Sequence, residues 1–395
     1  MRHRFTKVLL GLVLFTMLAG TATVTARSNK SAASYNVGIV YSRTGLLSAY
    51  GAEYVQGLKY GIQYATKGTN TVNGTTINLK LVDDKTDPAT AVNAAKDLIG
   101  QGYKLIAGST SSGVALQVAP LAAQNRVLFI SGPAASDAIT GVNKYTFRSG
   151  RQTLQDIAAS SSFLTGSGKK VVVFDQDSVF GHGNYAAVKA ILGGGKGQTV
   201  SEVSVPLTAT DFTPFAQQVK NANPDLVFVA WAGTTAGSMW KALDQQNVFN
   251  STTVATGLPE RATWPSFGDQ ATKIKFFTHY VYTAPKNKVN DWLVAQMKKR
   301  SQAPDLFSPD GFNAGLMIVQ ALKVGKYDPD KMVTALEGYK FMGPKGFEAV
   351  RPQDHALLQP MFRVQLTKSG SRLVAKVLGT ASSYATAPPL VAMKG

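Results

Sequence analysis

Histidine and cysteine, the side chains that most often bind metals or take part in nucleophilic catalysis, are scarce in this chain of 395 residues. There is no cysteine, which excludes disulfides, thiol nucleophiles and thiolate metal sites. Beyond His3, the histidines at 182, 279 and 355 lie far apart and form no His-x-x-x-His pair. We interpret His182 as exposed to solvent, and we expect no metal site.

A cluster of aspartates and a glycine-rich hexapeptide match parts of known binding motifs without completing them. Asp83 and Asp84 end a predicted strand, and Asp87 directly precedes a proline, as a helix cap does. A calcium loop would need a glycine and a glutamate that are missing here. The sequence GHGNYA at 181–186 fits Gly-x-Gly-x-x-Ala, but it begins six positions after the predicted strand end at Asp175. A dinucleotide site needs an immediate turn there, so we expect no cofactor.

Serine chemistry is the alternative from a different class of protein. Ser238 and Lys241 fit Ser-x-x-Lys, and residues 368–370 are similar to the Lys-Thr-Gly of penicillin-binding enzymes. No Ser-x-Asn element lies between them, and no Gly-x-Ser-x-Gly occurs in the chain. We therefore expect no enzyme, with a serine hydrolase that uses Ser238 or Ser112 as the alternative.

Anion binding is the chemistry that the stretch AGSTSSG at 107–113 offers. Its four hydroxyl residues and two glycines follow the apolar run KLI and precede a helical sequence. Hydroxyls and backbone amides at the start of a helix bind carboxylates well. Aromatic residues near comparable loops could wall such a site, although each could equally belong to the core: Tyr50, Phe180, Trp231 and Phe307. The pattern predicts a small-molecule site that needs no general base.

The elements that must position these loops alternate between strands and helices from residue 35 onward. Nearly all-apolar strands such as VVVFD are followed by helical patterns, which is typical of parallel sheets covered on both faces. Two segments, 102–127 and 223–248, each read strand, small-residue loop and helix, and each ends in a Gln-Asn pair followed by Val or Arg-Val. We predict an α/β fold with two similar lobes, since the length also fits two domains.

The first 26 residues have the order of a secretory signal. Basic residues at 2, 4 and 7 precede an apolar run from Val8 to Ala19 and small residues that end at Ala26. The run is short for a membrane span, and without a cysteine no lipid anchor can follow it. The net charge of +18 comes from 41 basic and 23 acidic residues that are scattered along the chain. We expect a periplasmic or secreted protein that binds no nucleic acid.

A series of motifs closely resembles, in order, those of the branched-chain amino-acid-type solute-binding proteins of ABC importers. The motifs are GLLSAYG, LVDDKTDPATAVNAAKDLI, GSTSSGVALQVAPLAAQNRVLFISGPAAS, YTFR, FGHG, DFTPFAQQVKNANPDLVFVA and QDHALLQP. The resemblance implies the type I periplasmic-binding fold, with two Rossmann-like lobes and parallel sheets joined by three hinge crossovers. The implied lobes comprise residues 36–149 plus 284–359 and residues 150–283 plus 360–395. By the same resemblance the crossovers lie near residues 148–153, 279–284 and 359–362.

The resemblance also implies how the site works. The residues that would hold a ligand carboxylate are Ser111, Ser112, Gly113, Ala134, Ala135 and Ser136. Tyr50, in the first loop, would close over the ligand. In the second lobe, Phe180 stands where the family usually has tyrosine, and the position of a frequent tyrosine after the FVA strand falls on Trp231 or Ala232. Leu258 or Pro259 takes the place of an ammonium-binding acid, with Glu260 out of register.

The implied function is capture of a small carboxylate, either an amino acid or an aromatic or aliphatic acid, and its delivery to the membrane permease of an ABC importer. A buried ammonium without a carboxylate would cost several kcal/mol, which favours acids without an amino group. A ligand sensor that docks on a receptor is the alternative among binding proteins. We expect a monomer.

Overall fold

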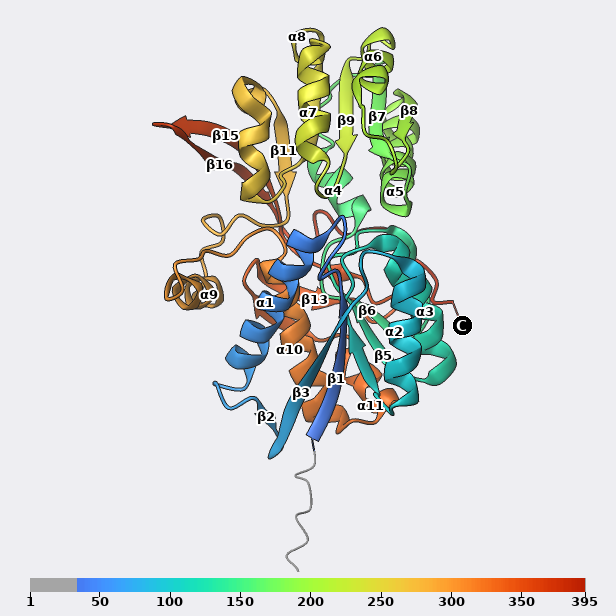
Figure 1. Cartoon of the computed structure of the whole chain (residues 1–395), viewed down its shortest axis with the longest axis vertical. Helices are drawn as coiled ribbons and strands as arrows, with labels where there is room; N and C mark the ends of the chain where they lie inside the picture. The colour runs from blue at the N-terminus through green and yellow to red at the C-terminus, as the bar shows by residue number, and fades with distance from the viewer. Residues whose placement is uncertain (1–33, 395) are drawn as a thin grey trace, which may run out of the picture. The chain divides into compact units, whose positions relative to one another are not determined.

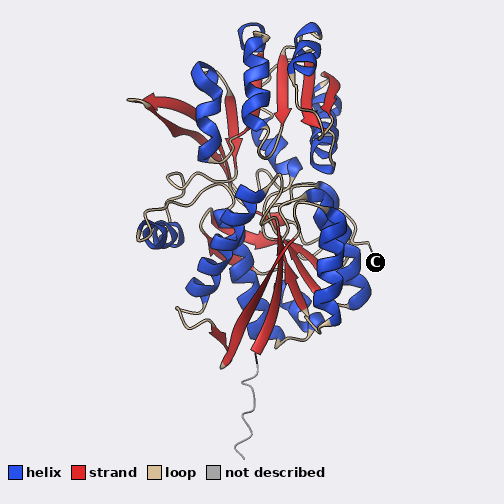
Figure 2. Cartoon of the chain, viewed as in Figure 1, coloured by secondary structure: helices blue, strands red, loops and turns tan. Residues whose placement is uncertain are grey.

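The computed structural model describes residues 34–394, so the predicted signal sequence, residues 1–26, lies outside the described residues. Two main sheets organise this part of the chain (Figure 1). Helices lie on both faces of each (Figure 2), which confirms the predicted α/β fold with two lobes. No helix within residues 34–394 is long and apolar enough to cross a membrane.

The sheet of the first lobe has six strands. Their spatial order is β2 (Thr71–Val72), β3 (Thr75–Asp83), β1 (Ser34–Tyr41), β4 (Leu105–Ala107), β5 (Leu128–Ser131) and β6 (Thr146–Arg148). All neighbours are parallel except β2 and β3. The elements that cover it are α1 (Ser48–Ala65), α2 (Pro88–Gly100), α3 (Ser112–Asn125), η1 (Asp137–Ile139), α10 (Ser308–Gly325) and α11 (Pro329–Leu336), and α9 (Lys288–Lys298) packs against α1 and α10. A small antiparallel sheet of β12 (Lys340–Gly343), β13 (Gly346–Val350) and β14 (Leu357–Leu358) completes the lobe.

The sheet of the second lobe has seven strands. Their order is β16 (Arg372–Ala381), β15 (Met361–Ser369), β11 (Lys275–Thr278), β10 (Thr253–Gly257), β9 (Leu226–Ala230), β7 (Lys170–Gln176) and β8 (Thr199–Val205). The last five are parallel, whereas β15 and β16 pair antiparallel. The surrounding helices are α4 (Thr153–Ser160), α5 (Val179–Val188), η2 (Lys189–Gly194), α6 (Thr213–Asn221), α7 (Ala236–Gln245), α8 (Val248–Ser251) and η3 (Arg261–Thr272).

The two lobes share one strand order. In the first lobe β3, β1, β4 and β5 are neighbours, and in the second β8, β7, β9 and β10 repeat the same sequence of second, first, third and fourth strand. The similar segments 102–127 and 223–248 correspond to β4–α3 and β9–α7, at equivalent places. In such sheets ligands bind beyond the carboxyl ends of the strands where the order reverses. The loops after β1, β4, β7 and β9 are therefore the loops expected to bind a ligand.

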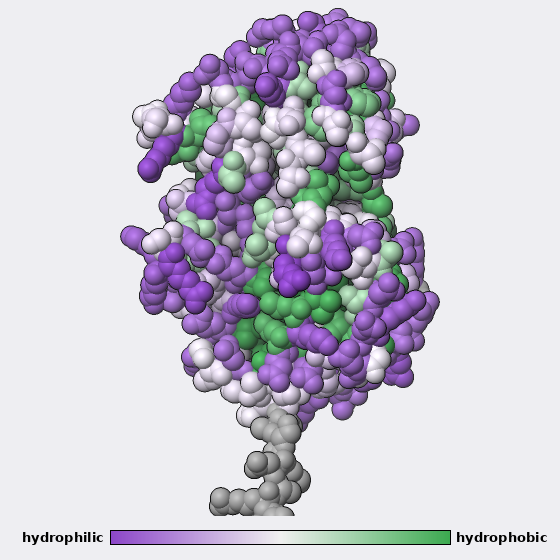
Figure 3. Space-filling model, in the orientation of Figure 1, coloured by the Kyte–Doolittle hydropathy of each residue, from purple (hydrophilic) through white to green (hydrophobic). Residues whose placement is uncertain are grey.

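The chain passes between the lobes three times, after β6, after β11 and after β14. Their number agrees with the three crossovers of the predicted fold. The residue boundaries predicted for each lobe remain a prediction. On the face shown in Figure 3, hydrophilic residues dominate the outer ends of both lobes, as expected when the apolar side chains of the sheets are buried.

Helices α1 and α10 pack with their backbones in contact. A Cβ added at Gly57 would lie 2.0 Å from the carbonyl oxygen of Ser308, and one added at Gly311 would lie 1.9 Å from that of Tyr54. Only glycine fits at these two positions. The contact joins an early segment of the chain to one that follows the second lobe, which fixes the first lobe as a discontinuous unit.

Candidate ligand-binding cleft

A cavity of about 540 Å³ lies between the carboxyl ends of the two main sheets. It is lined by residues that follow β1, β4 and β5 in the first lobe and β7, β9, β10 and β11 in the second. The volume lies within the range usual for small-molecule sites. Of the predicted site residues, those that line it are Tyr50, Ser111, Ser112, Gly113, Ala135, Phe180, Trp231, Leu258 and Phe307.

The first turn of α3 gives the cavity an anion-binding corner. Ser111 caps the helix, because its hydroxyl accepts a hydrogen bond from the N–H of Val114 at 3.4 Å. The N–H groups of Ser112 and Gly113 are among those that an α-helix leaves without an intrahelical partner. All three residues from 111 to 113 line the cavity. The positive end of the helix therefore faces the enclosed space.

The hydroxyls of Ser109 and Thr110, earlier in the loop 107–113, fix the loop to neighbouring segments. Ser109 donates to the carboxylate of Asp84 at 2.9 Å, and the hydroxyls of Thr110 and Ser42 are 2.7 Å apart. Gly108 has a φ of 115°, and a Cβ there would lie 1.7 Å from the carbonyl oxygen of Val40. The loop thus combines a rigid base with a binding edge. Asp87 accepts from the N–H of Thr90 at the start of α2, which confirms its predicted role as a helix cap.

The loop after β5 is fixed by a buried arginine that sequence reasoning placed only at a crossover. Arg148 donates to the carbonyls of Ala134 at 2.6 Å and Ser136 at 2.8 Å, and burial lowers its pKa to about 10. Ala135 faces the cavity, whereas Ala134 and Ser136 are buried and are not among its lining residues. The N–H of Ser136 donates to the hydroxyl of Ser112 at 3.1 Å, which joins this loop to the start of α3.

Arg151 and Asp156 line the cavity and were both missed by sequence reasoning. The Nε of Arg151 lies 3.3 Å from a carboxylate oxygen of Asp156, and its Nη1 donates to the carbonyl of Pro133 at 2.8 Å. The guanidinium also lies 5.6 Å from the ring centre of Phe307. Burial raises the pKa of Asp156 to about 6, and the charge of Arg151 opposes this shift. The one available signal was the position of Arg151 at the first predicted crossover.

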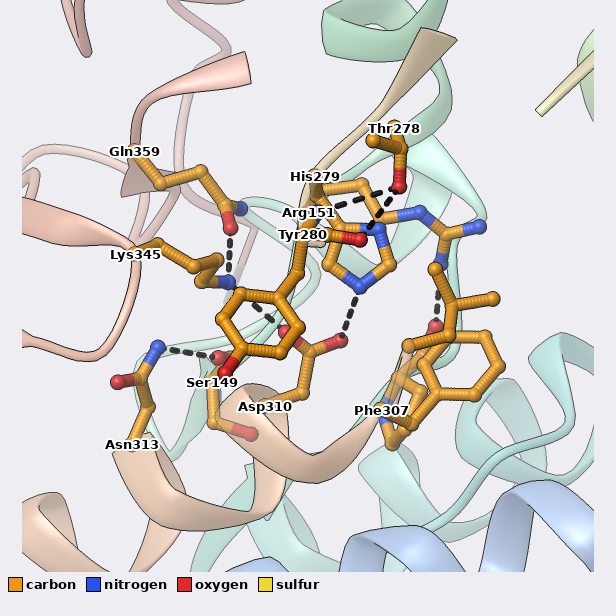
Figure 4. A network of polar contacts seen from close by, with 12 residues as sticks. Ser149, Arg151, Thr278, His279, Tyr280, Phe307, Asp310, Asn313, Lys345 and Gln359 are labelled. Atoms are coloured by element: carbon orange, nitrogen blue, oxygen red, sulfur yellow. Dashed lines mark hydrogen bonds and ion pairs between the residues drawn. The ribbon is translucent and has the colours of Figure 1, made fainter. Parts of the chain in front are cut away.

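Behind the cavity, a buried network of charges holds His279 in place (Figure 4). His279 lines the cavity, and its Nε2 lies 3.4 Å from Oδ2 of Asp310. Lys345 lies 2.8 Å from the other oxygen of Asp310 and 3.6 Å from Glu348, and it also bonds to Gln359. Burial lowers the pKa of His279 to about 4, although Asp310 opposes this, so the imidazole is neutral at pH 7.

The same burial acts on the two carboxylates of the network with different results. It would raise the pKa of Asp310, but Lys345 and His279 hold that pKa below its ordinary value. Burial raises the pKa of Glu348 to about 7, with Lys345 opposing. Asp310 is therefore the charged partner of Lys345.

Aromatic side chains from both lobes wall the cavity. Tyr50 is predicted in a loop, but it lies in the first turn of α1, which begins at Ser48. Its hydroxyl accepts a hydrogen bond from the N–H of Gly233 in the second lobe at 3.3 Å, and its ring centre lies 4.6 Å from that of Phe307. Opposite them, Trp231 donates from its indole to Thr235 at 2.9 Å. Phe228 and Phe277, both unpredicted, add to this wall.

Leu258 lies at the cavity wall and is 3% exposed, where the resemblance implies an ammonium-binding acid in other proteins. Glu260 is buried, bonds to Thr263 and is not among the lining residues. Burial raises its pKa, which its bond to Thr263 opposes. Among the described residues that line the cavity, Asp156 supplies the sole carboxylate.

The two serines considered for hydrolysis lie in different settings. Ser238 is exposed on α7, away from the cavity lining, and Ser112 accepts from the backbone of Ser136. In neither case does a described histidine bond to the serine hydroxyl. A nucleophilic serine needs a base such as histidine or lysine, and no hydrogen bond joins Ser238 to Lys241 among the described side-chain contacts.

Comparison with known proteins places this geometry among transport proteins. A family model described as "Periplasmic binding protein" matches residues 34–371. The Leu/Ile/Val-binding protein homolog 3 of Brucella melitensis is 24% identical over 319 residues, which cover 80% of this chain and 84% of that protein.

Two solved structures from Rhodopseudomonas palustris are similar over most of both chains. An ABC-type branched-chain amino acid transporter protein is 31% identical, with 90% of this chain and 98% of that chain covered and a TM-score of 0.75. A solute-binding protein of an ABC transporter in complex with 3,4-dihydroxybenzoic acid is 27% identical, with 89% and 98% covered and a TM-score of 0.77.

Proposed function

This chain belongs to the periplasmic binding protein family, and on that premise we propose that it captures a small carboxylate outside the cytoplasm for delivery to the permease of an ABC importer. The resemblance of residues 1–26 to a secretory signal supports the location. The cavity between the two lobes supports the capture, since ligand-binding clefts that close around a solute have this arrangement.

We propose that the ligand carboxylate lies between the first turn of α3 and Arg151. Both line the cavity, and they are joined through the loop after β5, which bonds to Ser112 on one side and to Arg151 on the other. A guanidinium and a helix N-terminus both favour a carboxylate over a neutral group. The aromatic wall from both lobes would then enclose the rest of the ligand.

The observation that carries the ligand class is the pairing of Asp156 with Arg151. Because Asp156 already pairs with Arg151, no other carboxylate among the described lining residues is left for a ligand ammonium. We therefore propose an aromatic or aliphatic acid without an amino group. The bound 3,4-dihydroxybenzoic acid in one similar protein supports this class. A branched-chain amino acid is the second candidate, favoured by the names of the curated relatives.

Calorimetric titration of a refolded, ligand-free chain tests the proposal with four matched solutes. Benzoate and 4-hydroxybenzoate present a ring and a carboxylate. Benzamide keeps the shape of benzoate without the charge, and L-phenylalanine adds an ammonium.

We expect the two acids to bind and the other two to bind at least tenfold more weakly. Tighter binding of L-phenylalanine than of either acid would replace the ligand class with amino acids. Binding of none of these solutes, together with absent uptake in a cell that carries the importer, would overturn the proposed transport role.

A further inference from the structure

Outside the ligand cavity, three metal-ligating side chains from separate elements meet on the second lobe. Asp175 lies near the end of β7, His182 in α5 and Glu202 in β8. One ligand atom of each lies within 4.8 Å of the other two. The strand register explains the meeting of the carboxylates: Asp175 pairs with Ser204, and Glu202, two residues earlier on β8, points to the same face.

Asp175 has no bonding partner for its buried carboxyl group. It is 0% exposed, and neither oxygen has a hydrogen-bond partner among residues 34–394. It is not among the residues that line the ligand cavity, so the proposed solute does not account for it. An unpartnered polar group of this kind lowers the stability of the folded chain.

His182 is held between two carboxylates in the manner of an oriented metal ligand. Its Nδ1 lies 2.9 Å from Glu202, and its Nε2 lies 2.9 Å from Asp177. When one ring nitrogen of a histidine binds a metal, the other usually donates to a carboxylate that fixes the tautomer. Asp177 occupies that outer place, which leaves Nδ1 directed to Glu202. The side chain of His182 is 51% exposed, so the cluster is open to ions from solvent.

We propose that Asp175, His182 and Glu202 bind a zinc-type divalent cation through one imidazole nitrogen and two carboxylates. An imidazole with carboxylates suits Zn²⁺, whereas Ca²⁺ and Mg²⁺ prefer six or more oxygen ligands. The cation would supply the buried carboxyl group of Asp175 with the partner that it lacks among residues 34–394.

Such a cation would tie α5 to the strands β7 and β8. The helix α5 also carries Phe180 and Asn184, two residues that line the ligand cavity. The site therefore stabilises one wall of the cleft without contacting the solute. It does not depend on the proposed function, because its ligands lie outside the cavity.

The test is titration of the untagged, chelator-treated chain with Zn²⁺ in the absence of solute, followed by calorimetry and thermal unfolding. A polyhistidine tag must be absent, since it would bind the metal itself. We expect binding of one equivalent and a rise in melting temperature of about 3 °C at a concentration 100-fold above the dissociation constant. His182→Gln and Asp175→Asn should each lose this binding.

Asp269→Asn is the matched control, because its exposed carboxylate lies on the same lobe and pairs with Lys368. It should bind Zn²⁺ as the unchanged chain does. If Asp175→Asn does not fold, Glu202→Gln carries the same test at a partly exposed position. Equal binding by His182→Gln and the unchanged chain would overturn the proposal, as would absence of binding to the unchanged chain at millimolar Zn²⁺.

Discussion

Replacing Arg151 by methionine should separate recognition of charge from recognition of shape in the cleft. The change keeps an apolar stem beside Phe307 but removes the guanidinium that lies 3.3 Å from Asp156 and 5.6 Å from the ring of Phe307. If the ligand carboxylate lies where we propose, it loses a buried charged partner.

The size of the effect follows from the two groups that hold the carboxylate. Truncating one partner of a buried, hydrogen-bonded charge pair costs about 2–5 kcal/mol. The first turn of α3 remains in place, so we expect the lower part of this range, about 2–3 kcal/mol. That corresponds to roughly a 30- to 140-fold weaker affinity for benzoate.

The assay is calorimetric titration of benzoate and benzamide into the unchanged chain and into Arg151→Met. Affinity for benzoate should fall by the stated factor, and affinity for benzamide should change less than threefold. Lys85→Met is the matched control, since this lysine lines the cavity but is exposed to solvent. An exposed charge contributes about 0.2–1 kcal/mol at most. An equal loss for both solutes would refute the assignment of Arg151 to the carboxylate.

A second variant separates binding from folding. Arg151→Met alone leaves Asp156 buried without its cation, which raises its pKa further and lowers stability at neutral pH. Adding Asp156→Asn removes that unpaired carboxylate. The double variant should regain most of the melting temperature but not the affinity for benzoate. Recovery of affinity in the double variant would mean that Arg151 acts only by neutralising Asp156.

Three further predictions concern the hydrogen bond between Tyr50 and Gly233 and the charge network behind the cavity. Tyr50→Phe removes the acceptor for the N–H of Gly233, so solute should dissociate roughly 2- to 10-fold faster in stopped-flow measurements; unchanged release would exclude this contact as a latch. Asp310→Asn leaves Lys345 buried without its nearest anion and should cost about 3–5 kcal/mol in denaturant unfolding, whereas a loss below 1 kcal/mol would show the pair to be dispensable. The pKa of His279 in the folded chain, about 4, lies below its ordinary value of 6.5, so the unfolded chain binds the proton first. The free energy of unfolding should therefore fall as the pH drops from about 6.5 to 4. His279→Gln should flatten that part of the curve of stability against pH, and an unchanged slope would contradict the assignment.

The fold could be predicted from the sequence because its signals are local. Apolar strands such as 171–174 are buried on both faces, and helical periodicity marks the elements between them. The loop 107–113 was recognisable because small hydroxyl residues directly followed a strand. The position of Tyr50 was wrong because a helix that begins at Ser48 has no capping side chain to announce it.

The parts of the site that were missed depend on contacts between distant segments. Lys345 pairs with Asp310, and Arg148 pairs with carbonyls of the loop after β5, so no local pattern marks either residue. The same holds for Asp175 and Glu202, whose meeting depends on the register of β7 against β8. The proposed cation site has no signal in the sequence, because ligand spacing along the chain does not mark three elements that converge only in the folded protein.

The backbone contact between α1 and α10 constrains the order in which this protein can fold. The two helices are separated in sequence by the whole of the second sheet except β15 and β16, so the first lobe closes only after residues 308–325 have been made. Bringing such distant segments together slows folding, because a long loop must be ordered before its contacts contribute. The second lobe has most of its parallel strands in one continuous stretch and can form earlier. A nascent chain that ends before α10 therefore exposes an apolar groove along α1, and protection of that groove is part of making the protein.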